Sequence, residues 1–231
     1  MVQVTRRERL RAATEQEIRQ HARTLLATQG REAVTLRAIA RELGITAPAL
    51  YRYYGSREEL LRALCNDICS DLAEQLHHEL RRTSGELAEK VRTACWEFRR
   101  WALHHPEEFA LVFATPPGDD GQQDQFARVF LGIVAPLMRE GAVRLHPDRL
   151  PVDLPDVSAY QNALADAFDA EGITVPAEAI SPESVYYLLR WWARLYGHVA
   201  LEVFGRFPFD LRHADELFNS LLQELLRESG L

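Results

Sequence analysis

The sequence of 231 residues has one lysine, three cysteines and no long apolar run. The cysteines are Cys65, Cys69 and Cys95, and their odd number and spacing give no disulfide framework, as expected in a reducing cytoplasm. Charged residues interrupt the apolar windows before the ~18 residues that a membrane span needs. The start, MVQVTRRERLRAAT, has basic residues but no apolar stretch, so we expect no signal peptide and a cytoplasmic protein that contacts no membrane.

Two of the cysteines bear on metal binding. Cys65 and Cys69 lie one helical turn apart and His77 follows two turns later, so one helix face offers three metal-binding side chains. No CxxC pair or HExxH motif accompanies them, and the alternative is that the thiols are buried and unliganded. We predict no metal site and no cofactor.

The scarcity of lysine leaves arginine as the basic residue at every position except Lys90. Arginine favours bidentate contacts with phosphate and guanine. Residues 1–60 hold 11 arginines and 7 acidic residues, a net charge of +4, whereas residues 61–231 carry a net charge of −11. This asymmetry predicts that only the N-terminal segment meets a polyanion, unless it is a chance fluctuation in a short segment.

Helix signals dominate the first 80 residues. Thr14 and Glu17 form a capping-box pattern for a first helix that ends at Gly30. Thr35 caps a second helix at 36–43, Gly44 ends it, and Thr46 caps a third helix that starts at Ala47 and stops at Gly55. Ser56 and Glu59 form a second capping-box pattern, which opens a long helix to about His78. Two short helices joined by a three-residue turn with glycine are typical of a helix-turn-helix.

The rest of the chain also reads as helical, without repeats or strand-like alternation. Helices are expected at 85–104, 106–114, 122–140, 156–170, 182–205 and about 212–228, with loops at 115–121 and 141–156 and a link at 171–181. We therefore predict an all-α fold, with a DNA-binding domain at 1–60 and a larger helical ligand-binding and dimerisation domain at 61–231.

A helix-turn-helix inserts the start of its second helix into the major groove, and here that start is Thr46-Ala47-Pro48-Ala49. Small side chains allow close approach, and an alanine methyl can meet a thymine methyl. Tyr51 and Tyr53 can direct hydroxyls at phosphates, Arg52 can reach a guanine or a phosphate, and Thr35 and Arg57 lie at helix starts that favour anions. Leu50 and Tyr54 are expected to pack inward. The alternative is that the remaining polar and aromatic face is ordinary solvated surface.

Residues 35–64, TLRAIARELGITAPALYRYYGSREELLRAL, resemble the DNA-binding segment of the TetR family of bacterial transcription regulators. The resemblance runs from Thr14 to Leu64, with Tyr54 where Phe is common and Arg57 where Lys is common. It implies phosphate contacts by Thr35, Thr46, Tyr51, Tyr53 and Arg57, and base-facing positions at or near Arg37, Ala47, Pro48, Ala49 and Arg52.

Residues 192–205, WARLYGHVALEVFG, resemble a segment of the TetR subgroup named for its Trp-His-Gly residues. Trp192 and Gly197 match, whereas Tyr196 stands in the place of the histidine. The resemblance implies a two-fold dimer in which the last two helices pair with their copies as a four-helix bundle. The alternative is that both helices are buried within one chain. The candidate dimer residues are Tyr186, Leu189, Val199, Val203, Leu217, Phe218, Leu221 and Leu225.

Aromatic residues near the middle of several helices predict a pocket for an apolar or aromatic effector. Each of them is also an ordinary core residue when taken alone. The candidates are Phe98, Trp101, Phe109, Phe113, Phe126, Phe130 and Trp191, with His105, Gln161 and Arg190 to orient the effector.

The function predicted from these features is a homodimeric repressor that binds a palindromic site in double-stranded DNA and is released by a small effector. One alternative is a DNA-binding activator or architectural protein without a ligand. Another is an enzyme that uses His104 and His105 with Glu107 and Glu108, but no nucleophile motif, phosphate loop or metal spacing supports it. We therefore expect no catalytic residues.

Overall fold

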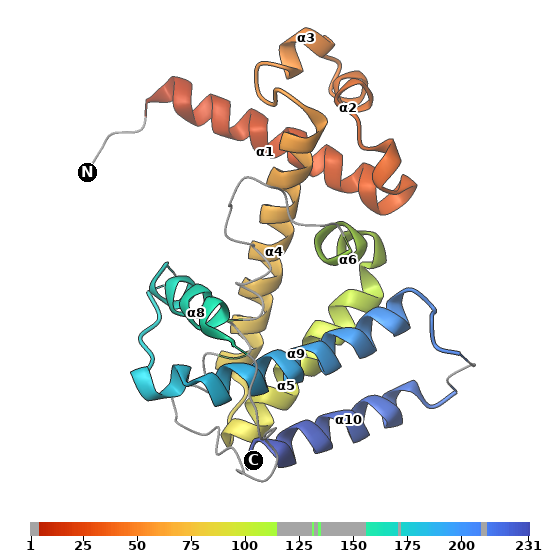
Figure 1. The fold of residues 1–231 in the computed structure, drawn as a ribbon. Helices are drawn as coiled ribbons and strands as arrows, with labels where there is room; N and C mark the ends of the chain where they lie inside the picture. Colours follow the sequence, from red (N-terminus) through yellow and green to blue (C-terminus); the bar gives the residue numbers. More distant parts are fainter. Residues whose placement is uncertain (1–4, 115–130, 132–133, 135–155, 171, 209–211) are drawn as a thin grey trace. The chain divides into compact units, whose positions relative to one another are not determined.

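The computed structural model describes residues 5–114, 131, 134, 156–170, 172–208 and 212–231, and every regular element in these ranges is helical (Figure 1). The prediction of an all-α fold is confirmed. Among these helices, none has both the length and the apolar character needed to cross a bilayer. The elements are α1 (Arg6–Gln29), η1 (Arg31–Ala33), α2 (Leu36–Glu42), α3 (Ala47–Leu50), α4 (Arg57–Arg82), α5 (Leu87–His104), α6 (Pro106–Phe113), α8 (Ser158–Ala170), η3 (Ala177–Ile180), α9 (Pro182–Val203) and α10 (Ala214–Glu228).

The chain divides into two compact units. The first unit comprises Met1–Cys69 with Glu107–Pro116, and the second comprises Ser70–Pro106 with Pro117–Leu231. The N-terminal half of α4 and all of α6 except Pro106 therefore belong to the first unit. The C-terminal half of α4 and helices α5, α8, α9 and α10 belong to the second.

In the first unit, α1 begins earlier than predicted. Thr5 and Glu8 form its capping box, in which the Thr5 hydroxyl accepts from the Glu8 N–H at 3.2 Å and the Glu8 carboxylate accepts from the Thr5 N–H at 2.7 Å. Thr14 lies inside the helix and donates its hydroxyl to the Leu10 carbonyl at 3.0 Å. The prediction that Thr14 begins the helix was wrong, because an equivalent capping pattern nine residues upstream precedes arginine, leucine and alanine, which all favour helix.

The core of the first unit gathers one face from each of its helices. α1 contributes Ile18, Ala22, Leu25 and Leu26, all buried. Other fully or almost fully buried apolar residues of this unit include Val34, Leu36, Ile39, Ala40, Leu50, Tyr54, Leu60, Leu61, Leu64 and Ile68. α3 is shorter than predicted: its regular helix ends at Leu50, and residues 51–53 continue as turns.

In the second unit, α5 packs against α9 and α10, and α8 packs against α9. α5 buries an apolar face that includes Leu87, Val91, Phe98 and Trp101. Arg99 is also buried on that helix, and its guanidinium holds Glu202 of α9 with two bonds of 2.7 and 2.6 Å and Asp215 of α10 at 2.8 Å. The planar fork of one arginine thereby joins three helices.

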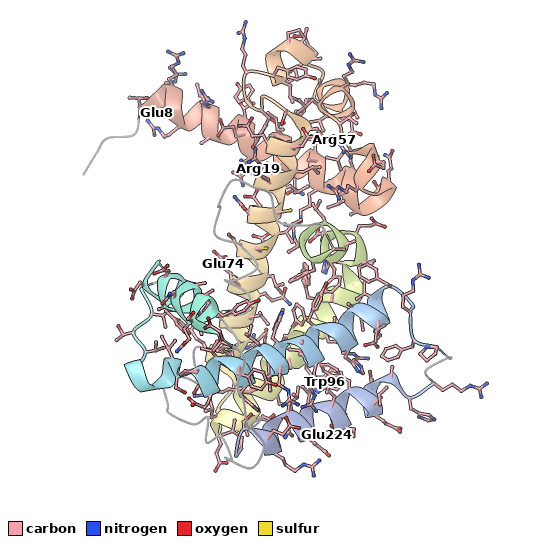
Figure 2. The ribbon with its side chains drawn as sticks, viewed as in Figure 1. Glu8, Arg19, Arg57, Glu74, Trp96 and Glu224 are labelled. Carbon is pink, nitrogen blue, oxygen red and sulfur yellow. The ribbon has the colours of Figure 1, made fainter. Side chains whose placement is uncertain are left out.

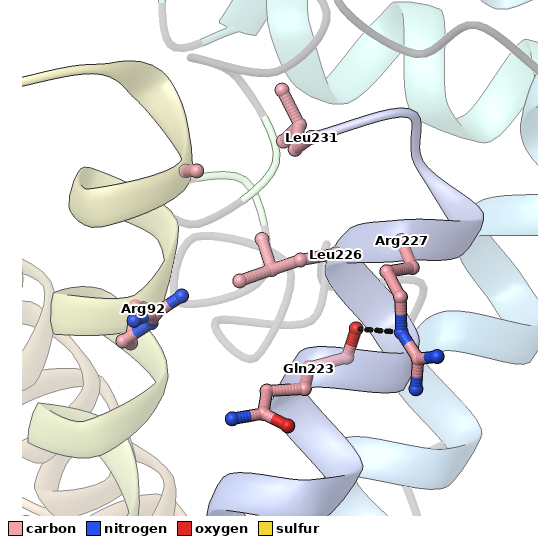
Figure 3. A pocket seen from close by; sticks show the side chains of 6 residues that line it. Arg92, Gln223, Leu226, Arg227 and Leu231 are labelled. Carbon is pink, nitrogen blue, oxygen red and sulfur yellow. Dashed lines mark hydrogen bonds between the residues drawn. The ribbon is translucent and has the colours of Figure 1, made fainter.

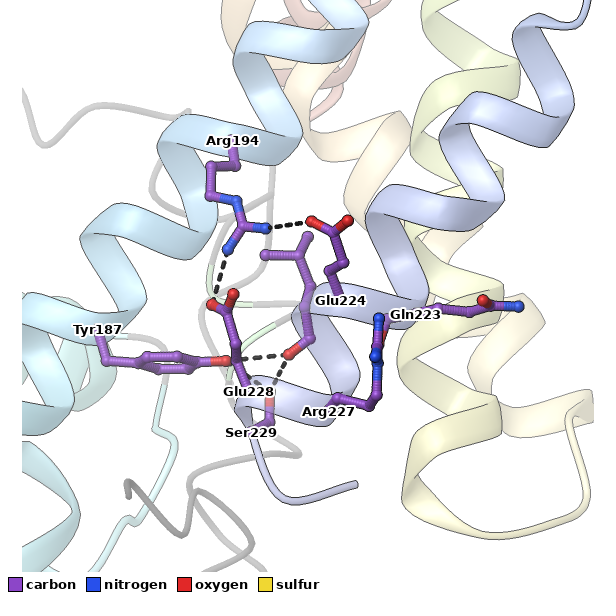
Figure 4. Close-up of polar contacts among 8 residues, drawn as sticks. Tyr187, Arg194, Gln223, Glu224, Arg227, Glu228 and Ser229 are labelled. Carbon is purple, nitrogen blue, oxygen red and sulfur yellow. Dashed lines mark hydrogen bonds and ion pairs between the residues drawn. The ribbon is translucent and has the colours of Figure 1, made fainter. Parts of the chain in front are cut away.

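A second group of polar contacts joins α9 to the end of α10 (Figure 4). Arg194 lies 2.7 Å from Glu228 and 3.1 Å from Glu224. The Tyr187 hydroxyl donates to the Leu225 carbonyl at 3.1 Å and lies 2.7 Å from the Ser229 hydroxyl. These bonds tie the C-terminal end of α10 to the first half of α9.

The loops predicted at 115–121 and 141–156 and the helix predicted at 122–140 lie largely outside the described residues. Within that helix, Leu131 and Val134 are described as helical and buried. They share a core cluster with Ala167 and Phe168 of α8 and Leu188 of α9. The predicted link at 171–181 includes the short η3 helix.

The three cysteines are free thiols, with Cys69 and Cys95 buried and Cys65 half-buried. Burial raises the pKa of Cys95 far above its usual range. Across the described ranges, no group of three or more His, Cys, Asp or Glu side chains is arranged to hold a metal ion.

Candidate nucleic-acid interface

The turn between α2 and α3 is built around Gly44, whose φ of +64° lies in the left-handed region that glycine adopts without strain. The N–H of Gly44 donates to the Arg41 carbonyl at 3.3 Å, and the N–H of Ile45 donates to the Ala40 carbonyl at 3.0 Å. This pair of bonds is a Schellman motif, which satisfies the last carbonyls of α2 and reverses the chain direction. The short turn presents α3 as a helix-turn-helix requires.

The start of α3 exposes small side chains. Thr46 and Pro48 are exposed, and Ala47 and Ala49 are half-buried. The Thr46 hydroxyl makes no capping bond to the helix, although Thr46 is its N-cap residue. This hydroxyl therefore remains available to an external partner.

The tyrosines that follow α3 have different environments. Tyr51 is 50% exposed, whereas Tyr54 is only 6% exposed and packs into the core with fully buried Leu50, as expected. Tyr53 is half-buried, and the Arg11 guanidinium lies over its ring at 5.9 Å. Arg52 is exposed. Tyr51, Arg52 and Tyr53 thus keep surface that a ligand can reach.

Arg19 of α1 holds Tyr54 in place, a role that sequence reasoning missed. It donates to the Tyr54 hydroxyl at 3.0 Å and pairs with Asp67 of α4 (Figure 2). Burial raises the pKa of the Tyr54 hydroxyl, although the Arg19 hydrogen bond opposes that effect. No local pattern predicts the ion pair, because its members are 48 residues apart.

Thr35 and Arg57, both predicted to contact phosphate, also have structural roles. The Thr35 hydroxyl caps α2 by accepting from the Ala38 N–H at 3.1 Å. Arg57 donates to the Val34 carbonyl at 2.7 Å and to the Arg31 carbonyl at 2.6 Å (Figure 2). The guanidinium therefore fastens the segment before α2 to the start of α4. Arg37, in contrast, is exposed.

The predicted effector residues fall in both units. Phe98 and Trp101 are buried in the second unit, whereas Phe109 and Phe113 belong to the first unit and stack on each other with centroids 4.8 Å apart. Trp191 is 2% exposed, and its Nε1 finds no hydrogen-bond partner among the described residues. Phe126 and Phe130 lie outside those residues.

The polar members of the predicted effector set have local partners. The His105 ring stacks on Trp101, with centroids 5.6 Å apart. The Gln161 side chain donates to the Ile180 carbonyl at 2.8 Å, and the exposed Arg190 lies over the Tyr186 ring at 5.8 Å.

A separate pocket of about 220 Å³ lies between α5 and α10 (Figure 3). It shares no residue with the predicted effector set. Its lining is Ala88, Arg92, Gln223, Leu226, Arg227 and Leu231.

The predicted dimer residues divide by burial. Val199, Phe218 and Leu225 are fully buried within the protomer, so their side chains belong to its own core. The other five candidates keep exposed surface: Tyr186, Leu189, Val203, Leu217 and Leu221. Leu201 and Phe204 add apolar surface at 41% and 40% exposure, respectively, and neither was among the candidates.

The residues of the enzyme alternative serve as structural groups. His104 and His105 each place Nδ1 near a carbonyl at the end of α5, Arg100 at 2.7 Å and Trp101 at 3.0 Å. Buried Glu108 accepts two hydrogen bonds from Arg23, at 2.7 and 2.9 Å. These contacts complete a helix end and an ion pair.

Two family profiles match the chain: "Bacterial regulatory proteins, tetR family" over residues 18–64, and "Tetracyclin repressor-like, C-terminal domain" over residues 91–225. The HTH-type transcriptional regulator Rv1816 of Mycobacterium tuberculosis is 30% identical over 218 residues, covering 90% of this chain and 88% of that protein. The solved structure of SCO4313 is 30% identical, covers 96% of this chain and 100% of its own, and has a TM-score of 0.61. FadR from Bacillus subtilis, solved in complex with stearoyl-CoA, shares the fold at 13% identity and a TM-score of 0.56, with 92% and 98% covered.

Proposed function

The chain belongs to the TetR family of DNA-binding transcriptional regulators, and on that premise we propose that it is a homodimeric repressor released by a small apolar or aromatic effector. The observation that carries the proposal is the start of α3, where exposed Thr46 and Pro48 flank small alanine side chains after a tight glycine turn. That surface fits closely against the edges of bases in a major groove.

We assign different contacts to different parts of this surface. Ala47, Pro48 and Ala49 face bases, with Arg37 and Arg52 at the edges of the same region. Thr46, Tyr51 and Tyr53 contact phosphates, which position the protein and give most of the affinity. Thr35 and Arg57 lie beside this surface, and their bonds to α2 and to the segment before it hold the reading head in shape.

For the dimer, we propose that the exposed face of α9 meets its copy together with α10. Ala193, Gly197 and Leu201 follow one another at spacings of four and so share one side of the helix. Outside its own helix backbone, a Cβ added to Gly197 would meet no atom of the described residues within 4 Å. A glycine in mid-helix costs about 1 kcal/mol relative to alanine, and close approach by a second copy gives a reason to keep it. Leu217 and Leu221 extend this face on α10.

For the effector, we propose a site in the second unit that includes Trp101 and Trp191. The buried Trp191 Nε1 is a donor in need of an acceptor, and buried polar groups are normally hydrogen-bonded. An acceptor on an otherwise apolar molecule would satisfy it. FadR, which shares the fold, binds a long acyl-CoA. The proposal includes no catalysis, and it assigns the chain to the cytoplasm because the DNA it reads lies there.

The DNA assignment is tested with a duplex recovered by the full-length protein from a random-sequence pool. Tyr51→Ala is expected to weaken binding and to lower the salt dependence by about one phosphate contact. Tyr160→Ala is the matched control, since Tyr160 is a tyrosine of similar exposure in α8. Both variants should melt like the parent. If Tyr51→Ala binds the duplex as tightly as the parent, the interface is wrongly placed.

The repressor assignment is tested with a thermal-shift screen of apolar and aromatic compounds. A compound that raises the melting temperature should also release the protein from the duplex, because an effector must bind the two states differently. A stabilising compound that leaves DNA affinity unchanged would contradict release by an effector. Enhanced transcription from the bound site would instead indicate an activator.

A further inference from the structure

The beginning of α1 forms an exposed helical arm, which we define as residues 6–13 (Figure 1). Every residue of the arm is exposed, and the first buried residue of α1 is Ile18. The arm therefore contributes nothing to the core of the first unit. It also precedes residues 18–64, the segment that matches the family profile of the DNA-binding domain.

The arm is strongly basic. It holds four arginines, Arg6, Arg7, Arg9 and Arg11, and a single acidic residue, Glu8. The Glu8 carboxylate is used by the capping box with Thr5. None of Arg6, Arg7 and Arg9 forms an ion pair with any residue that the structure describes, although Arg11 pairs with Glu15 at 2.8 Å. Three positive charges thus face solvent without a partner.

This placement of charge is unfavourable for the helix itself. The N-terminal end of an α-helix carries a partial positive charge, so it repels a nearby arginine instead of being stabilised by it. Arg6 and Arg7 occupy the first two positions of α1, and Arg9 follows within the first turn or so. An external anion would remove the repulsion and satisfy the guanidinium donors.

The C-terminal end of the arm lies beside the proposed DNA-binding surface. Arg11 places its guanidinium over the ring of Tyr53, at 5.9 Å from the ring centre. Tyr53 is one of the residues assigned to phosphate contact, so Arg11 connects the arm to the proposed interface. From Arg11 to Arg6 the helix rises about 7 Å, which corresponds to roughly two base-pair steps of duplex DNA.

We propose that the arm binds the phosphate backbone of the DNA that flanks the sequence read by α3. This inference rests on the proposed DNA interface and extends it by a contact that carries no base specificity. Arg6, Arg7 and Arg9 supply charge-assisted hydrogen bonds to phosphate oxygens, and Arg11 bridges the arm to Tyr53. Charge complementarity and continuity with the α3 surface identify duplex DNA as the occupant.

The test compares Arg6→Ala/Arg9→Ala with the charge-matched control Arg81→Ala/Arg82→Ala, which removes two exposed arginines from the last turn of α4. The probes are the selected duplex with long flanks and the same duplex trimmed to its core. The arm variant should bind the long duplex tenfold or more weakly at about 0.15 M salt, with the slope of log affinity against log salt reduced by about 0.9 per lost contact.

Trimming the flanks should weaken the parent but not the arm variant, and both variants should keep the parent's sequence preference. The arm variant should melt at or above the parent's temperature, because alanine is the better residue at a helix start of this charge. Equal affinity and salt slope for parent and arm variant would overturn the proposal. So would equal losses in the arm and control variants, which would indicate only net charge.

Two further outcomes separate the arm from the interface on which it rests. If Tyr51→Ala abolishes binding while the arm variant matches the parent, the arm proposal fails and the α3 interface stands. If the parent shows no salt-dependent affinity for any duplex, both fail. Arm-dependent binding to anionic vesicles, without any effect of the variant on DNA, would overturn the proposal in favour of a lipid surface.

Discussion

At the scale of single residues, burial separates side chains that the sequence places together. Tyr51 and Tyr54 differ by three positions, yet one is half exposed and the other is held in the core by Arg19. Their helical spacing predicts this division, because Tyr54 lies four residues after buried Leu50. The bond from Arg19 could not be predicted, since it depends on how α1 and α4 meet in space.

Substitutions at Arg57 and Arg37 separate an arginine that stabilises the fold from one that we expect only to contact DNA. Arg57→Ala should lower the free energy of unfolding by about 1–3 kcal/mol, because two carbonyls lose a charged donor. Arg57→Lys should recover only part of the lost stability. Lysine keeps a charged donor, but its ammonium lacks the planar fork that reaches two carbonyls. Exposed Arg37→Ala should leave stability unchanged, even though we expect it to weaken DNA binding. Urea unfolding measures the stability of all three variants, and an Arg57→Ala protein as stable as the parent would show that these bonds contribute nothing.

His198 should make the second unit sensitive to acid. Burial lowers the pKa of His198 below its ordinary value of 6.5, and Arg99 adds to this effect while Glu202 opposes it. The unfolded chain therefore binds a proton below that pH that the folded chain does not, and stability falls as pH drops through this window. The melting temperature should decline less between about pH 7.5 and pH 5.5 in His198→Gln than in the parent.

The control for that measurement is His77→Gln, which replaces an exposed histidine of α4. Its pH dependence should follow the parent. If His198→Gln shows the same decline as the parent, the acid sensitivity of the second unit comes from other groups.

At the scale of helices, capping residues and glycines predicted most of the boundaries. Thr35, Gly44 and Ser181 end or begin helices where local pattern places them. The start of α1 was misplaced because two capping patterns compete in one helical stretch, and only the full helix shows which is used. Buried ion pairs were missed for another reason. Arg23 and Glu108 are 85 residues apart, and Arg99 and Glu202 are 103 apart, so no local spacing reports them.

The candidate DNA and effector sites also differ in how far the sequence alone could predict them. The exposed tip of α3 could be located from the sequence, because small residues follow a glycine turn. The effector residues could not be separated from core residues, because Phe98 and Phe109 are both fully buried and belong to different units. An aromatic side chain in a helix has the same sequence spacing whether it lines a ligand cavity or packs in the hydrophobic core.

The Arg99 cluster should make the junction of α5, α9 and α10 a major source of stability. Arg99→Met should cost about 3–5 kcal/mol, because it leaves the mostly buried Glu202 carboxylate without its partner. Asp215→Ala should cost less than about 1 kcal/mol, since Asp215 is largely exposed. Urea unfolding with full-length protein measures both.

The double variant Arg99→Met/Glu202→Leu supplies the decisive comparison. Removing both charges should restore much of the stability lost in Arg99→Met, because no unpaired charge remains. Losses that simply add in the double variant would contradict the account of a coupled ion pair.

Gly197 reports on the proposed face of α9. Within a protomer, Gly197→Ala should stabilise the helix by about 1 kcal/mol, because the added methyl would contact no described residue outside its own helix. In the proposed dimer the same methyl enters the space between two copies. The dimer should therefore be weaker and dissociate at a higher protein concentration than the parent's. Sedimentation measures the dissociation constant of the dimer. A Gly197→Ala dimer as tight as the parent's would remove this face from the interface.

At the scale of the whole molecule, charge and assembly are linked. The net charge of +4 in residues 1–60 and −11 in residues 61–231 would make the C-terminal part of the chain repel DNA while the N-terminal part attracts it. A dimer formed through α9 and α10 would bring two reading heads to one duplex. Affinity would then depend on whether both heads can engage at once, because the second contact occurs within the same complex.

The spacing of the two half-sites tests this assembly directly. A two-fold dimer reads half-sites about one helical turn of DNA apart, so inserting about five base pairs would turn one half-site to the opposite side of the duplex. Binding should then fall toward the affinity of a single half-site, and its steep salt dependence should fall with it because fewer phosphates are contacted.

An insertion of about ten base pairs, a full turn, would return both half-sites to the same side of the duplex but increase the distance between them. Recovery of the affinity for this duplex would require the two reading heads to move apart. An affinity that stays low would mean that the dimer fixes the separation of the heads. Binding that ignores the five-base-pair insertion would show that each protomer reads DNA alone.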